Sequence, residues 1–77
     1  MVKAATMLLE SVESSQMDRV GYNSGIMIVE FKGGTKYLYV GVDKFTYDSM
    51  MSAPSVGSFF SKNIKNDESI KCIKLEF

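Results

Sequence analysis

The chain has 77 residues, with nine basic and nine acidic side chains, one Cys and no His. This length allows one domain, spanning residues 1–77. The missing His excludes His-based nucleophilic catalysis, and with a single Cys it argues against a soft-ligand metal site or an internal disulfide. We therefore expect a non-enzymatic protein with no cofactor. The zero net charge argues against long DNA and anionic membranes as partners.

The location of the protein is predicted from what the sequence lacks. No apolar run approaches the ~20 residues that span a bilayer. The start, Met1–Glu10, does not show the pattern of a signal peptide. A single Cys suits a reducing compartment. We expect a soluble protein of the cytoplasm, with no membrane contact.

The first half of the chain has the pattern of β-strands. Apolar residues predict a first strand over Thr6–Val12, and Ser14–Gln16 reads as a polar break. A rough alternation over Met17–Tyr22 predicts a second strand. The turn Asn23–Gly25 follows, in which Asn or Gly takes the positive φ angle.

The clearest element is a hairpin of Ile26–Phe31 and Thr35–Val40, joined through Lys32-Gly33-Gly34. A three-residue loop with Gly in the left-handed position sets Glu30 opposite Lys36. A two-residue turn would pair unlike side chains on both faces, so we prefer the first register. One face then carries Met27, Val29, Phe31, Tyr37 and Tyr39, and the other carries Ile26, Ile28, Leu38 and Val40.

Both faces of this hairpin are therefore apolar, whereas a sheet with one wet face normally alternates apolar and polar residues. The second face must be covered by another part of the chain or by another copy of it. In so short a chain the second option is credible, and we expect a homo-oligomer.

After Val42 the apolar period changes to that of helices. Asp43 is a good N-cap for a helix that Pro54 ends. Ser55 can cap a second helix with Val56, Phe60 and Ile64 on one ridge. The six Met residues are expected to fill the core or subunit contacts.

The chain ends in alternation over Ile70–Phe77, which predicts a last strand with one buried face formed by Ile73, Leu75 and Phe77. Cys72 is expected to be a small buried apolar residue. The fold class is therefore α+β: a small antiparallel sheet of four or five strands with a central hairpin, packed with a two-helix segment that a C-terminal strand follows.

Two features could bind a ligand. Tyr37 and Tyr39 lie on one side of a strand, where they can stack on bases or pack under the helices with only their hydroxyls reaching out. The segment Pro54–Ser58 opens a helix with free N–H groups and hydroxyls, which suits a phosphate or carboxylate, and Lys62 could assist. Alternatively, Ser55 only caps the helix, and Gly57 lets that helix lie close to the sheet.

These residues together resemble the KTSC domain, a family named for a C-terminal segment of some lysyl-tRNA synthetases and also found as small stand-alone proteins of bacteria and their phages. The similarity covers Ser14 to about Lys65. It is carried by Ser14-Ser15, Val20-Gly21-Tyr22, Met27, Val29, Phe31, Gly34, Tyr37, Tyr39, Val42, Tyr47, Ala53-Pro54-Ser55, Gly57, Phe60 and Ile64. Where the family usually has Asn directly after the Phe, this chain has Ser61, and Asn63 is the residue that can substitute for it.

The resemblance implies a non-catalytic module with a suggested role in RNA binding. We expect a binding module for a nucleotide-like ligand or short single-stranded RNA. Its predicted site residues are Tyr37, Tyr39, Ser55, Gly57, Ser58, Lys62 and Asn63. The alternative is a phage-encoded inhibitor or interaction protein that acts as a homo-oligomer, one version of which sequesters a host nucleotide signal between subunits.

Overall fold

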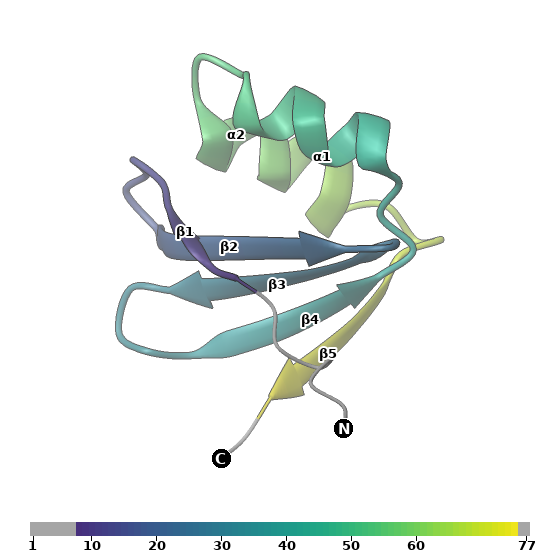
Figure 1. Cartoon of the computed structure of the whole chain (residues 1–77), viewed down its shortest axis with the longest axis horizontal. Coiled ribbons are helices and arrows are strands. Elements are labelled where there is room, and N and C mark those ends of the chain that lie inside the picture. Colours follow the sequence, from purple (N-terminus) through teal and green to yellow (C-terminus); the bar gives the residue numbers. More distant parts are fainter. Residues whose placement is uncertain (1–7, 76–77) are drawn as a thin grey trace.

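The computed structural model describes residues 8–75, which form two layers. One layer is a five-stranded antiparallel sheet in the order β1-β2-β3-β4-β5, and the helices form the other (Figure 1). The elements are β1 (Glu10–Ser11), β2 (Met17–Asn23), β3 (Ile26–Phe31), β4 (Lys36–Val40), α1 (Lys44–Met51), α2 (Val56–Phe60), a π-helical continuation η1 (Ser61–Lys65) and β5 (Lys71–Leu75). The predicted α+β class, with a central hairpin and a C-terminal strand, is confirmed.

The central hairpin has the predicted register. Glu30 lies opposite Lys36, and Val29 lies opposite Tyr37. The N–H of Phe31 donates to the carbonyl of Thr35 over 2.8 Å, which closes the loop. Both loop glycines have positive φ angles, 101° and 98°, a conformation in which a Cβ would be strained. The register could be predicted because a one-residue slip would exchange the two faces of each strand.

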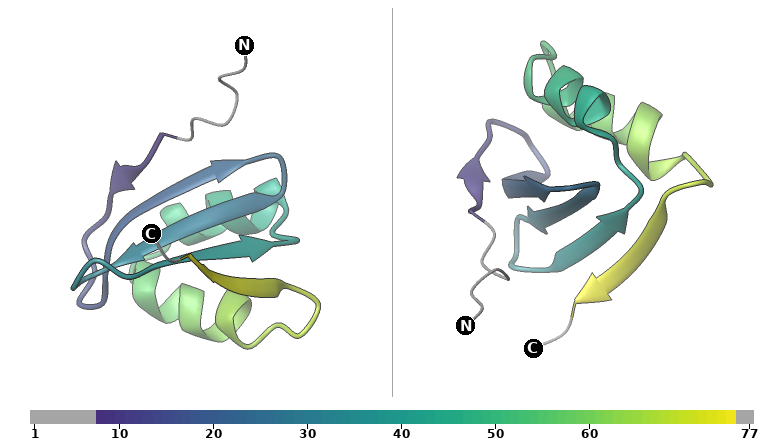
Figure 2. Two further views of the ribbon diagram at one scale, coloured as in Figure 1. Left: turned by 90° about the horizontal axis from the view of Figure 1, so that it is seen from below. Right: turned by 45° about the vertical axis from the view of Figure 1, so that its right-hand side comes forward.

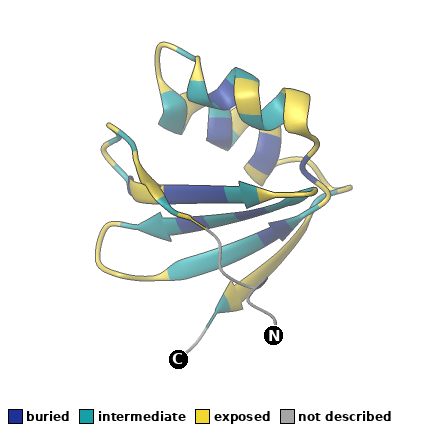
Figure 3. Ribbon diagram, viewed as in Figure 1, coloured by how far each residue is buried: buried dark blue, intermediate teal, exposed yellow. Residues whose placement is uncertain are grey.

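The core lies between the sheet and the helices, as the buried residues in Figure 3 show. Its members share an exposure of 5% or less: Met17, Val20, Met27, Val29, Tyr39, Val42, Met50, Phe60 and Ile64. Three of them are methionines, which confirms the prediction of a core role for Met17, Met27 and Met50. One hairpin face therefore lies beneath the helices.

The helices begin at the predicted caps. A side-chain oxygen of Asp43 accepts from the N–H of Thr46 over 2.8 Å, and the hydroxyl of Ser55 accepts from the N–H of Ser58 over 3.2 Å. Between them, α1 ends at Met51, three residues before Pro54. A capped start satisfies N–H groups that have no partner inside the helix.

Both end strands differ from the prediction. Of the described residues, only Glu10 and Ser11 form a strand paired with β2, and residues 6 and 7 of the predicted first strand lie outside the described residues. The last strand exists, but Cys72 is exposed and Ile73 is 42% exposed, so the predicted buried Cys and buried face are wrong. The reason is position: β5 is an edge strand that pairs with β4, and alternation alone does not show whether a layer covers it. Phe77 lies outside the described residues.

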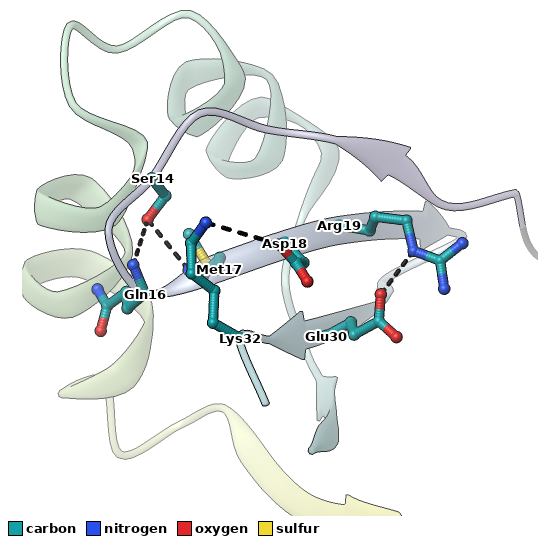
Figure 4. Close-up of polar contacts among 7 residues, drawn as sticks. All are labelled: Ser14, Gln16, Met17, Asp18, Arg19, Glu30 and Lys32. Atoms are coloured by element: carbon teal, nitrogen blue, oxygen red, sulfur yellow. Dashed lines mark hydrogen bonds and ion pairs between the residues drawn. The ribbon is translucent and has the colours of Figure 1, made fainter. Parts of the chain in front are cut away.

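The second face of the hairpin stays half-buried. Figure 2 shows the helices on one side of the sheet only, so in residues 8–75 no helix covers the face of Ile28 and Leu38. At one end of this face, Glu30 accepts from Arg19 Nε over 2.5 Å (Figure 4), and Lys36 Nζ lies 3.5 Å from its other oxygen. The Glu30 side chain is only 14% exposed.

These contacts predict how stability depends on pH. The hydrogen bond from Arg19, opposed by desolvation and aided by Lys36, lowers the pKa of Glu30 below its ordinary value of 4.5. A lowered native pKa means that the stabilisation is complete above pH 4.5 and is lost as the pH falls through the native value. We expect Glu30→Gln to flatten this part of the acid-unfolding curve, measured by circular dichroism. Glu68→Gln, in an exposed loop, is the control, and an equal change in both variants would contradict the assignment.

Candidate functional site

Two hollows on the helix side of the sheet share Gln16. The first, the aromatic hollow, has a volume of about 460 Å³ and is lined by Gln16, Phe31, Thr35, Tyr37, Tyr39, Phe60, Lys65 and Cys72. The second, the serine hollow, has a volume of about 230 Å³ and is lined by Ser14, Ser15, Gln16, Ser55, Gly57, Ser58, Ser61 and Lys62. One is lined by four aromatic rings and the other is rich in hydroxyls, so together they suit a ligand with a flat part and a polar part.

The aromatic hollow is built from three elements. Phe31 of β3 and Tyr37 of β4 meet edge to face, with ring centroids 5.7 Å apart. Phe60 of α2 closes the group at 5.8 Å from Phe31 and 5.3 Å from Tyr39, again at steep angles. Such edge-to-face pairs are the favoured arrangement of aromatic rings. The rings hold one another in fixed orientations, which is a condition for recognising a planar group.

The two predicted tyrosines differ in their surroundings. Tyr39 is 5% exposed and belongs to the core, whereas Tyr37 is half-buried, and their centroids are 6.4 Å apart. Burial above all, and then hydrogen bonding with Cys72, raises the pKa of Tyr39 well above its ordinary value of 10. Its hydroxyl therefore stays neutral, with Cys72 as a hydrogen-bond partner. Of the pair, Tyr37 is the ring that a ligand reaches more easily.

Gln16 joins the loop before β2 to the helix. Its Nε2 donates to the carbonyl of Gly57 over 3.3 Å and to Ser61 Oγ over 3.5 Å. The loop is held in shape by Ser14 Oγ, which accepts from the N–H groups of Gln16 and Met17 over 3.1 and 3.2 Å (Figure 4). The amide of Gln16 is thereby placed at the boundary of both hollows.

Gly57 lies where that loop comes close to the helix. A Cβ on Gly57 would lie 3.1 Å from Gln16 Nε2 and 3.1 Å from Ser14 Oγ. Contacts this short force a neighbour to move. The helix lies close to the loop before β2 at Gly57, rather than close to the sheet as the sequence predicts.

The structure brings four predicted residues together in the serine hollow: Ser55, Gly57, Ser58 and Lys62. Ser55 Oγ caps the N–H of Ser58, so this N–H already has a partner. Asn63 lies elsewhere. Its Nδ2 donates to the carbonyl of Phe59 over 3.3 Å, and with Lys62 it borders a shallow hollow beside Pro54.

Sequence reasoning missed several lining residues. The sequence indicates only a polar break at Gln16, and it does not mark the other lining residues as members of a site: Ser14, Ser15, Ser61, Lys65, Thr35 and Cys72. Phe31 could have been found, because the predicted register placed it on the same face as Tyr37 and Tyr39. No local pattern distinguishes Gln16, whose role depends on a contact across 41 positions of the chain.

A further hollow of about 500 Å³ lies beside the rings of Tyr22 and Tyr47. These rings stack with centroids 4.7 Å apart and an interplanar angle of 14°. The Tyr22 hydroxyl donates to the carbonyl of Val42 over 2.8 Å and accepts from the N–H of Gly25 over 3.1 Å. These bonds tie the β2–β3 turn to the start of α1, so the pair has a structural role.

The fold and the hollows define a small α+β domain in which one sheet face, the loop before β2 and the helical segment of α2 and η1 line the candidate site. The KTSC domain family matches residues 13–67, and the chain belongs to this family. A protein from Tsukamurella paurometabola is 34% identical over 59 residues, which cover 74% of this chain and 88% of that protein.

A solved structure agrees with the fold. The crystal structure of a KTSC domain protein from Yersinia pestis is similar, with a TM-score of 0.81 and 31% identity, covering 92% of this chain and all of that one. Among the described residues, no helix is both long enough and apolar enough to cross a membrane.

Proposed function

We propose that this chain is a non-catalytic module that binds a nucleotide-like ligand in the bacterial cytoplasm. The observation that carries the proposal is the shared position of Gln16 between an aromatic hollow and a hydroxyl-lined hollow with a lysine at its border. The exposed thiol of Cys72 suits a reducing compartment.

In this proposal the base lies against Tyr37 in the aromatic hollow. Every base has a π face, so an aromatic ring can stack on it whatever the identity of the base. The side-chain oxygen of Gln16 can accept from a donor on the base, since its Nε2 already donates to Gly57 and Ser61. The hydroxyls of Ser58 and Ser61, with Lys62, then receive the phosphate.

The zero net charge favours a compact ligand over a long strand. Polymer binding at physiological salt depends on several phosphate contacts, each of which weakens with salt. A mononucleotide or the end of a short single-stranded RNA needs one or two such contacts. We therefore propose a mononucleotide as the preferred ligand and a short RNA as the second candidate ligand.

The test is calorimetric titration of the full chain with the four ribonucleoside monophosphates and with a short single-stranded RNA at low salt. We expect Lys62→Ala to weaken mononucleotide binding by about tenfold, because a hydrogen bond to a charged group contributes about 1.5–3 kcal/mol. Lys44→Ala is the matched control, since Lys44 pairs with Asp48 over 3.0 Å on α1, outside both hollows.

Two results would count against the proposal: no binding of any monophosphate at millimolar concentration, or equal losses in Lys62→Ala and Lys44→Ala. Recovery of the nucleotide unchanged after long incubation supports the non-catalytic part. If the RNA binds and no mononucleotide does, the ligand of this site is a strand and not a compact nucleotide.

A further inference from the structure

The sheet face opposite the helices, here called the outer face, is apolar over three strands. The strand register brings Ile28, Leu38 and Ile73 into one row, since Ile28 pairs with Leu38 and Leu38 pairs with Ile73. The remaining aliphatic members of this face are Ile26, Val40 and Leu75. Ile73 is 42% exposed, and the helices lie on the other side of the sheet (Figure 2). A contiguous apolar face of this kind marks an interaction surface.

One end of the outer face carries a row of alternating charge. Arg19, Glu30 and Lys36 are neighbours across β2, β3 and β4. Glu30 forms ion pairs with both cations. The row is thus positive, negative, positive, with the aliphatic side chains directly beside it.

We propose that the outer face binds a second copy of this chain, around a two-fold axis that runs parallel to the strands between β3 and β4. Such an axis exchanges β3 with β4 across the interface and keeps the charged rows at the same end. Glu30 of each copy then lies over Lys36 of the other copy, and Ile28 of each copy lies over Leu38 of the other. Within β3 and β4, charges therefore meet opposite charges and aliphatic groups meet aliphatic groups, while Arg19 of β2 lies over Leu75 of the second copy at the edge of the interface.

The other in-plane axis, perpendicular to the strands, is disfavoured by the same register. It would set Glu30 over Ile26 and Lys36 over Val40 of the second copy. Charged groups would then be desolvated against aliphatic side chains, which costs free energy that no new pair offsets. The chain's net charge of zero adds no overall repulsion between two copies.

This dimer leaves both hollows open, because they lie on the helix side of the sheet. Each copy would bind its ligand independently, and the site is not shared between subunits. Dimer formation and ligand binding can therefore be tested separately.

The first measurement is the molar mass of the full chain from low micromolar to near-millimolar concentration, by light scattering or sedimentation equilibrium. We expect the mass to approach twice 8.6 kDa. Leu38→Lys should weaken association by more than about 100-fold, because it places an unpaired charge in the interface. Phe45→Lys is the matched control: Phe45 is 79% exposed but lies on α1, so the dimer should persist.

The second measurement determines which two-fold axis relates the two copies. It remains informative even if the Leu38→Lys variant does not fold. In a Cys72→Ser background, Ile28→Cys and Leu38→Cys proteins are mixed and treated with a short bismaleimide. The proposed axis predicts mainly mixed 28–38 cross-links, whereas the perpendicular axis predicts 28–28 and 38–38.

Several outcomes would overturn the proposal. They are a monomer at all concentrations, a dimer that Leu38→Lys leaves intact, and cross-links of the 28–28 type. A wild-type monomer that dimerises only after removal of residues 1–7 would assign the outer face to this chain's own N-terminal segment.

Discussion

Replacing Phe60 by Ala is expected to lower the free energy of unfolding by about 3–5 kcal/mol. Phe60 is 1% exposed, and its ring contacts Phe31 of β3 and Tyr39 of β4. These contacts join α2 to both strands of the central hairpin. Removing the ring loses its burial and leaves a cavity that two neighbouring rings, fixed in a small sheet, can only partly fill. Since native domains are stable by only about 0.05–0.15 kcal/mol per residue, this loss is a large part of the total.

Urea unfolding followed by circular dichroism measures this effect. Phe59→Ala is the matched control, because Phe59 adjoins Phe60 in the same helix but is only half-buried. We expect Phe59→Ala to cost clearly less. If the two variants lose equal stability, then the packing of α2 on the sheet differs from that described. Because Phe60 also lines the aromatic hollow, the folded fraction of the Ala variant should bind nucleotide more weakly.

Local chemistry explains which elements the sequence could predict. The hairpin register follows from two glycines and from the pairing of like side chains, all within 15 consecutive residues, 26–40. The helix starts follow from Asp43 and Ser55, whose side chains bond to N–H groups three residues on. Each of these features depends on contacts between near neighbours, which a sequence displays directly.

The features that could not be predicted depend on distant contacts. Cys72 lies on the helix side of an edge strand and Ile73 lies on the opposite side, and no alternation pattern shows whether a layer covers either side. Gln16 reaches Gly57 and Ser61 from a loop far away in the chain, so its place between the hollows arises only on folding.

The sequence leaves open whether Tyr37 and Tyr39 stack on a ligand or pack under the helices. Substitutions of Tyr39 distinguish these two interpretations. We expect Tyr39→Ala to cost about 3–5 kcal/mol, as for other buried aromatic residues, and Tyr37→Ala to cost less. Tyr39→Phe keeps the ring and its packing against Phe60, so its loss should stay near the ~1 kcal/mol of one hydrogen bond. A large stability loss in Tyr39→Ala with nearly unchanged ligand affinity in Tyr39→Phe would assign Tyr39 to the core and leave recognition to Tyr37.

The pH dependence gives an independent check on the same residue. Burial raises the native pKa of Tyr39 above its ordinary value of 10, so the neutral phenol is favoured in the folded state. The stabilisation that results is complete below pH 10 and is lost as the pH rises towards the native value. Wild-type protein should therefore lose stability above pH 10 more steeply than Tyr39→Phe, measured by thermal unfolding across an alkaline series. Parallel curves for the two proteins would mean that the Tyr39 hydroxyl is solvated, and that its ring forms a wall of the hollow open to solvent.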